Sequence, residues 1–155
     1  MLSEDRWLQF GTPRKNGLED IKCIVIHNTG SDLSARDIFD YLQNKSQDSR
    51  SCHYLVDHNE VIDVMPLDYV AWNTGVAYDY GNMHGIAVEI CSNQDEDIYL
   101  QGQDKAIELI KKLMEEHNLT KNDIYFHNDF LQDYNCPATI LQMYKTRKNF
   151  IEKFF

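Results

Sequence analysis

The chain has 155 residues, 43% of them hydrophobic, which suffices for one domain with a buried core and argues against a disordered chain. The formal net charge of -10 argues against nucleic acid as a partner, because phosphate binding needs a basic face. No apolar run approaches the roughly 20 residues of a membrane-spanning helix. We therefore expect a globular domain that binds neither nucleic acid nor membrane.

The N-terminal residues 1–20 carry two aromatic residues, two glycines and a proline among polar residues. We predict an irregular arm there, held against the body of the protein by Trp7 and Phe10. The core is expected over residues 21–153, so that residues 1–155 form a single domain.

The first predicted strand covers residues 22–27, an apolar and mostly β-branched run that ends at His27. A helix is predicted to follow over residues 34–44, because apolar residues recur there at helical spacing after a capping serine. Two β-rich runs at 52–57 and 60–66 flank a short polar turn and predict a hairpin.

The second half of the chain alternates predicted strands and helices after a long loop at residues 67–84. Strands are expected at 85–91 and 123–127, and helices at 104–117 and 138–153. Helices interspersed with buried strands indicate an α/β domain, and the hairpin makes its central β-sheet mixed and flanked by helices.

Three side chains form a candidate zinc site: His27, His127 and Cys136. Both histidines end apolar strands, and Cys136 precedes a proline that opens a helix, which places its sulfur near the positive helix end. Two imidazoles and one thiolate leave a fourth zinc position open for water. A histidine at a strand end is more often a polar rim residue, however, and a single cysteine is more often a core residue.

Several motifs in order resemble those of the zinc-dependent N-acetylmuramoyl-L-alanine amidases, the family of phage lysozyme-type amidases and peptidoglycan recognition proteins. The resemblance covers about residues 20–145. Its motifs are His27-Asn28-Thr29-Gly30, Ser51-Cys52-His53-Tyr54-Leu55-Val56-Asp57, Val70-Ala71-Trp72-Asn73-Thr74-Gly75, Gly85-Ile86-Ala87-Val88-Glu89-Ile90-Cys91, His127-Asn128-Asp129 and Cys136-Pro137.

The resemblance implies a mixed sheet with a groove for peptidoglycan, and hydrolysis of the amide between N-acetylmuramic acid and L-alanine. It places one zinc ion per chain on His27, His127 and Cys136. It also places Glu89 at the acidic position that takes a proton from the attacking water and returns it to the leaving nitrogen. The residues agree with this role, because a single carboxylate inside an apolar strand should have a raised pKa. The alternative is an outward-facing Glu89 paired with a lysine.

The sequence departs from the family pattern at two positions of the expected groove. Tyr134 stands where many members have a lysine that stabilises the oxyanion, and its hydroxyl can donate a hydrogen bond instead. Asn73 stands where a histidine is common, and it can bind a peptide carbonyl or a sugar amide. The other candidate substrate-binding residues are Trp72, Thr74, Asn28 and His53, the last with a structural role as an equal alternative.

The predicted function is therefore a zinc amidase that acts on the cell wall, as the catalytic domain of a phage or prophage endolysin or of a bacterial autolysin. The N-terminus shows no signal peptide, which fits a protein made in the cytoplasm and released by lysis or through a pore; a domain cut from a longer secreted protein fits too. A separate wall-binding domain would lie outside this chain. The alternatives are a non-catalytic peptidoglycan-binding module on the same fold and a metal-free structural domain.

Overall fold

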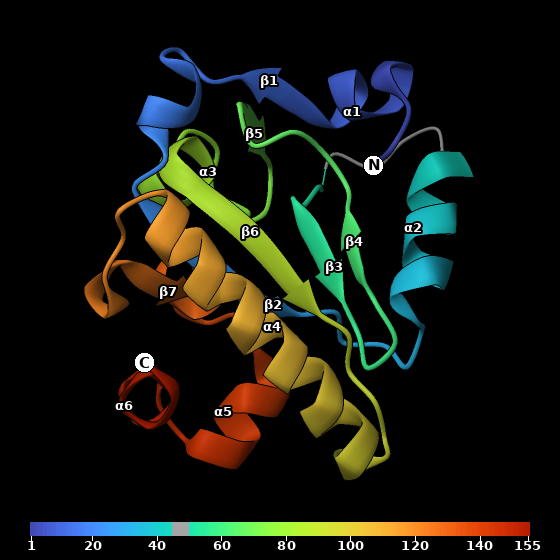
Figure 1. Cartoon of the computed structure of the whole chain (residues 1–155), viewed down its shortest axis with the longest axis vertical. Coiled ribbons are helices and arrows are strands. Elements are labelled where there is room, and N and C mark those ends of the chain that lie inside the picture. The colour runs from blue at the N-terminus through green and yellow to red at the C-terminus, as the bar shows by residue number, and fades with distance from the viewer. Residues whose placement is uncertain (45–49) are drawn as a thin grey trace.

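The computed structural model describes residues 1–44 and 50–155, and its central sheet has five strands in the order β4-β3-β6-β2-β7 (Figure 1). Strands β3, β6, β2 and β7 are parallel neighbours, and β4 runs antiparallel to β3, so the predicted mixed sheet is confirmed. The helices and strands in chain order are α1 (Glu4–Phe10), β1 (Gly11–Pro13), η1 (Gly17–Asp20), β2 (Cys23–Asn28), α2 (Ala35–Asn44), β3 (Tyr54–Val56), β4 (Val61–Asp63), β5 (Tyr69–Ala71), α3 (Tyr80–His84), β6 (Gly85–Ile90), α4 (Glu96–Glu116), η2 (Lys121–Asp123), β7 (Ile124–Phe126), η3 (His127–Asp129), α5 (Ala138–Tyr144) and α6 (Arg147–Phe154).

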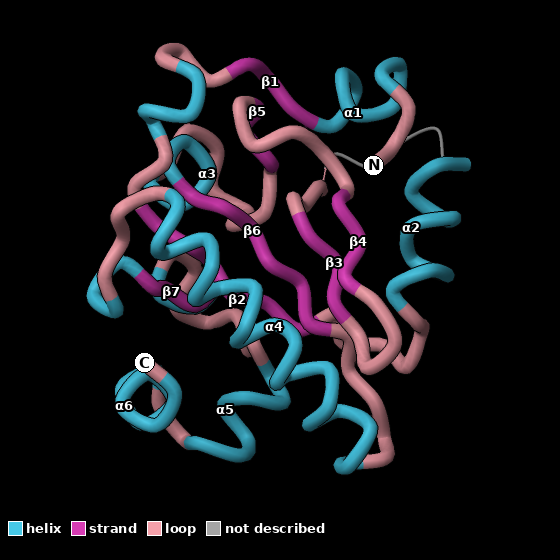
Figure 2. The backbone as a smooth tube through the Cα atoms, viewed as in Figure 1, coloured by secondary structure: helices cyan, strands magenta, loops and turns pink. Residues whose placement is uncertain are grey.

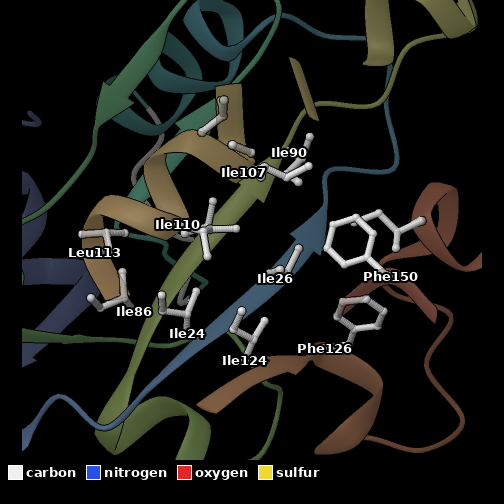
Figure 3. Close-up of a cluster of buried hydrophobic side chains, with 14 of the residues drawn as sticks. Ile24, Ile26, Ile86, Ile90, Ile107, Ile110, Leu113, Ile124, Phe126 and Phe150 are labelled. Carbon is white, nitrogen blue, oxygen red and sulfur yellow. The ribbon is translucent and has the colours of Figure 1, made fainter. Parts of the chain in front are cut away.

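The main core lies between one face of the sheet and the helices α4, α5 and α6 (Figure 2). Figure 3 shows isoleucines of β2, β6 and β7 beside side chains of α4, with Phe126 near Phe150 of α6. Burial of each such side chain stabilises the fold by about 1.5–3 kcal/mol. Because side chains alternate along a strand, Ile24 and Ile26 facing this core leave His27 facing the opposite side.

The opposite face of the sheet is covered by α2 and the N-terminal segment, which form a second cluster of buried side chains. The predicted helix at 34–44 is confirmed as α2, and Ser34 and Asp37 exchange hydrogen bonds at its start. The predicted hairpin is confirmed as the β3–β4 pair. The polar stretch at residues 46–51 predicts a loop between α2 and the hairpin, and its residues 46–49 lie outside the described residues.

The prediction of an irregular arm over residues 1–20 was wrong. This segment contains α1 and β1, and β1 pairs antiparallel with β5. Phe10 is buried, and the ring of Trp7 meets that of Tyr69 edge-on with centroids 4.6 Å apart, so the expected attachment is present. A three-residue strand is too short to show alternation, and it forms only because a distant partner accepts and donates its backbone hydrogen bonds.

Arg14 is a buried cation of the same segment. Its guanidinium donates to the backbone carbonyls of Leu67, Met83 and Gly85 at 2.6–2.7 Å. Burial lowers the pKa of Arg14 to about 10. These bonds tie the N-terminal segment to the end of α3 and the start of β6.

Three other predicted boundaries differ from the structure. The predicted loop at 67–84 contains β5 and the short helix α3. Helix α4 begins at Glu96 rather than at 104, because Asp95 caps a first turn whose polar residues hide the apolar periodicity. The helix predicted at 138–153 is two helices, α5 and α6, separated at Lys145, where φ is 69°. Among the described residues, no helix combines the length and apolar character needed to cross a membrane.

His53 directly precedes β3, is fully buried and bonds through its side chain to β5 and β6. Its Nδ1 atom accepts a hydrogen bond from the Ala87 amide at 2.9 Å, and its Nε2 atom donates to the Tyr69 carbonyl at 2.9 Å. This arrangement requires the neutral ring, and burial lowers the pKa of His53 from 6.5 to about 3.

The free energy of unfolding should therefore decrease as the pH is lowered, and this pH dependence should be smaller in His53→Gln. Below about pH 6.5 the unfolded chain binds a proton at this position that the folded chain rejects until about pH 3. This difference removes about 2.5 kcal/mol of the free energy of unfolding between about pH 7 and 4.5. Urea unfolding of both proteins at the two pH values, with chelator present, measures the difference. An equal pH dependence in the two proteins would contradict this role of His53.

Candidate metal centre and its cavity

The three predicted metal ligands lie together at the carboxyl ends of β2 and β7. His27 is near the end of β2, and His127 directly follows β7; because these strands are parallel neighbours, the two imidazoles lie side by side. Their Nδ1 atoms are 3.1 Å apart, and the Cys136 sulfur is 3.7 Å from Nδ1 of His27. All three residues are buried, and their ligand atoms lie within 4.8 Å of one another.

Each histidine ring is oriented by a hydrogen bond at its other nitrogen. Nε2 of His127 lies 2.9 Å from the Thr74 carbonyl oxygen, which can only accept, so this nitrogen carries the proton. Nε2 of His27 lies 2.9 Å from Oδ1 of Asn73, whose amide nitrogen donates to the Ala71 carbonyl. With the tautomers assigned from this network, both Nδ1 atoms are unprotonated and face each other.

Two facing lone pairs 3.1 Å apart cannot share a hydrogen bond, and a cation between them removes their repulsion. Zinc bonds of about 2.0–2.3 Å in a tetrahedron place pairs of ligand atoms about 3.3–3.6 Å apart. The observed 3.1 Å between the nitrogens and 3.7 Å between nitrogen and sulfur are close to these values. The donor set of two neutral imidazoles and one sulfur therefore fits zinc.

Burial sets the protonation of the three ligands. It lowers the pKa of His27 to about 4 and also lowers the pKa of His127, with the neighbouring His27 as a second cause. Both rings are therefore neutral near pH 7, as a metal ligand requires. Burial raises the pKa of Cys136 to about 12, which outweighs the expected influence of the α5 N-terminus. A bound metal must displace this thiol proton, so metal binding releases protons.

Glu89 is the next residue along the same face of the sheet, directly opposite His27 in the β2–β6 register. Its Oε1 atom lies 4.0 Å from Nδ1 of His27. Its Oε2 atom is buried and has no hydrogen-bond partner among the described residues. Burial raises the pKa of Glu89 to about 7, as the sequence predicted for a carboxylate in an apolar strand. Glu89 lines the cavity described next, which argues against the outward-facing alternative.

A cavity of about 360 Å³ opens over the metal ligands and Glu89. A cavity of this volume can hold a few residues or one sugar, but it is too small to enclose a polymer. The wall opposite the histidines is mainly apolar and comes from α2 and the segment before it. The lining residues outside the metal ligands and Glu89 are Asn28, Thr29, Ser31, Leu33, Ile38, Tyr41, Leu42, Arg50, Ser51, Cys52, Leu55, Asn73 and Tyr134.

Two residues predicted to line the groove, Tyr134 and Trp72, have rings that are at least partly exposed. Tyr134 is 47% exposed at the cavity, and its ring centroid lies 4.5 Å from that of His127. Trp72 is partly exposed, and its ring meets that of Tyr78 edge-on at 5.7 Å. Trp72 is not a lining residue of the cavity. Tyr134 is therefore next to the metal ligands, whereas Trp72 lies outside the cavity.

Asn28 lies at the cavity, but its side chain is committed to the fold. Its Oδ1 atom accepts from the amides of Thr139 and Ile140 in the first turn of α5. Its Nδ2 atom donates to the Ile90 carbonyl and to the hydroxyl of Tyr99. Asn28 thus fixes α5 against β2, and α5 follows directly on Cys136.

The remaining predicted substrate-binding residues are also engaged within the protein. Asn73 and Thr74 are buried and hold the two histidine rings, and His53 lies in the sheet with both ring nitrogens occupied. Asn82 is a further buried residue of the site that no motif predicted; it lies in α3 and binds the backbone of Asn73 and Thr74. No local pattern marks such a residue, because its partners lie in another loop.

Comparison with known proteins agrees with this geometry. A family model described as N-acetylmuramoyl-L-alanine amidase matches residues 17–139. N-acetylmuramoyl-L-alanine amidase CwlA of Bacillus subtilis (strain 168) is 35% identical over 120 residues, a match that covers 76% of this chain and 43% of CwlA. The structure of PlyL superposes with a TM-score of 0.85 at 25% identity, covering 99% of this chain and 92% of that one. The catalytic domain of XlyA superposes with a TM-score of 0.75 at 30% identity, covering 85% and 86%.

The matched region is thus less than half the length of CwlA. The family match nevertheless covers most of the present chain, from the strand that carries His27 to the helix that follows Cys136. The resemblance seen in the sequence motifs is confirmed, and the chain belongs to the N-acetylmuramoyl-L-alanine amidase family.

Proposed function

We propose that this domain hydrolyses the amide between N-acetylmuramic acid and L-alanine in peptidoglycan, with one zinc ion held by Nδ1 of His27, Nδ1 of His127 and Sγ of Cys136. The observation that carries the proposal is the pair of unprotonated Nδ1 atoms 3.1 Å apart beside the Cys136 sulfur. The family supplies the substrate class, and the carboxylate of Glu89 beside this group supplies the proton chemistry.

The proposed roles follow from the surroundings of each side chain. Zinc, when bound, supplies a Lewis acid that polarises the scissile carbonyl and makes water more acidic. Glu89 accepts the proton of the attacking water and delivers it to the leaving nitrogen of L-alanine, a role that suits a carboxylate with a pKa of about 7. The Tyr134 hydroxyl donates to the oxyanion of the tetrahedral intermediate. Asn73 and Thr74 keep the two imidazoles in the tautomer that binds metal.

The substrate is proposed to enter the cavity with its peptide side chains against the apolar wall of α2. Trp72 and Tyr134 offer aromatic surface on which sugar or peptide groups can pack. The proposed place of action is the bacterial cell wall, as in an endolysin or autolysin. The net charge of -10 gives the domain no electrostatic attraction to anionic wall polymers, so binding must come from the groove or from another module.

Metal content and wall hydrolysis test the ligand set together. We expect about one zinc per chain in the wild type, and release of amino groups from purified walls. Cys136→Ser should lose most of the zinc and the hydrolysis, because a hydroxyl is a poor zinc ligand. Cys91→Ser is the matched control, since Cys91 is also buried but belongs to no group of possible metal ligands among the described residues. Zinc without hydrolysis of any wall type would favour the non-catalytic binding module, and absence of zinc from wild type would refute the proposal.

Glu89→Gln separates proton transfer from metal binding. The amide has the shape of the carboxylate but cannot accept the proton, so we expect zinc content to remain and the rate of hydrolysis to fall about 10²–10⁴-fold. Elemental analysis and single-turnover rates on walls provide the two measurements. A variant with near wild-type rates would exclude Glu89 as the base, and a variant without zinc would assign it a role in metal binding instead.

A further inference from the structure

Both histidine rings of the proposed metal site are held by consecutive residues of one loop. Asn73 accepts from His27 through its side chain, and Thr74 accepts from His127 through its backbone carbonyl. We infer that Asn82 is the positioning residue that fixes both acceptors, and thereby both metal-binding nitrogens. The inference concerns the same site as the proposed function and rests on it for the role of zinc.

The side chain of Asn82 is 2% exposed and is fully committed to this loop. Its Oδ1 atom accepts from the Asn73 amide at 2.8 Å, from Nδ2 of Asn73 at 3.0 Å and from the Thr74 amide at 3.1 Å. Its Nδ2 atom donates to the Val76 carbonyl at 2.9 Å. The Asn82 backbone amide in turn donates to Oδ1 of Asp79, the residue that caps α3, at 2.7 Å.

The neighbouring glycines show that this close approach is built into the chain. A Cβ atom at Gly81 would lie 2.7 Å from Cγ2 of Thr74 and 2.8 Å from the ring of Phe130, so a larger residue would push α3 off the loop. Gly75 has a φ of 76°, which an L side chain adopts only with strain, and this turns the loop directly after Thr74. The backbone thus brings Asn82 under both acceptors.

The network also determines which end of the Asn73 amide faces His27. Because Nδ2 of Asn73 donates to Oδ1 of Asn82 and to the Ala71 carbonyl, Oδ1 of Asn73 must be the atom that meets His27. An amide free to flip would present its nitrogen to His27 and favour the opposite tautomer, which places the proton on the metal-binding Nδ1. Asn82, together with the Ala71 carbonyl, therefore selects the ring form that can bind a cation.

Measurement of zinc affinity tests whether Asn82 acts on both histidine rings through Asn73 and Thr74. We expect Asn82→Ala to weaken zinc binding by about 100-fold and Asn73→Ala by about 10-fold, since loss of Asn82 releases both rings and loss of Asn73 releases one. Competition of each protein with a fluorescent zinc chelator gives the dissociation constants. The inference would be overturned if the zinc dissociation constant of Asn82→Ala were within about twofold of the wild-type value, or if Asn82→Ala were weakened less than Asn73→Ala.

A matched control separates positioning from general loss of stability. Gln103 is another buried amide, 1% exposed, and its Nε2 atom donates to Tyr144 on the α4 side of the sheet. Gln103→Ala should lower the melting temperature but leave zinc affinity unchanged. Asn82→Asp retains an accepting oxygen and should bind zinc more tightly than Asn82→Ala. If Gln103→Ala weakens zinc binding as much as Asn82→Ala does, the effect is one of stability and the inference fails.

The tautomers provide a readout that does not depend on zinc or activity. Long-range ¹H–¹⁵N spectra of the chelator-treated protein should show His27 and His127 protonated at Nε2 in wild type and Gln103→Ala. In Asn82→Ala we expect mixed tautomers with retained circular dichroism. Unchanged tautomers in Asn82→Ala would overturn the inference whatever the zinc result. If the wild type binds no zinc but Asn82→Ala still changes the tautomers, the proposed function is refuted and the positioning role of Asn82 is retained.

Discussion

The site depends on the position of β2 between two parallel partners. Pairing with β6 sets Glu89 opposite His27, and pairing with β7 places His127 beside it. The register is maintained by the core, because alternate isoleucines of these strands are buried under α4, α5 and α6. A slip by one residue would turn His27 and Glu89 into that core and move the isoleucines to the opposite face of the sheet. The hydrophobic packing on one face therefore determines the chemistry on the other.

Desolvation is the second effect that organises the site, and it acts on each group in a useful direction. Burial keeps both imidazoles neutral, so that they can bind a cation, and it brings the pKa of Glu89 to about 7, where the group can both accept and release a proton. The Cys136 thiol is the exception, because burial opposes its ionisation and only a bound cation can compensate. Occupancy of the site is thus coupled to proton release.

Much of the sheet could be predicted from the sequence, because long apolar runs such as those ending at His27 and Ile90 need no distant information to be recognised as buried strands. The ligand triad followed from the family motifs and from the strand ends. The three-residue strands β1 and β5 could not be predicted, since each forms only through its partner. Distant partners also explain why the roles of the polar residues were harder to predict. Asn28 and His53 looked like groove residues, but their hydrogen-bond partners lie in distant elements that no local pattern reveals.

Two parts of the chain form the cavity, and they contribute different kinds of side chain. One side holds the proposed metal ligands and Glu89: the sheet carries His27 and Glu89, and Asn73 and Thr74 orient the two histidine rings. The other side is the apolar face of α2, which is joined to the β3–β4 turn by the bond from the Ala35 amide to Asp57. Such a separation allows the lining of the cavity to vary among members of this family while the candidate metal centre stays the same.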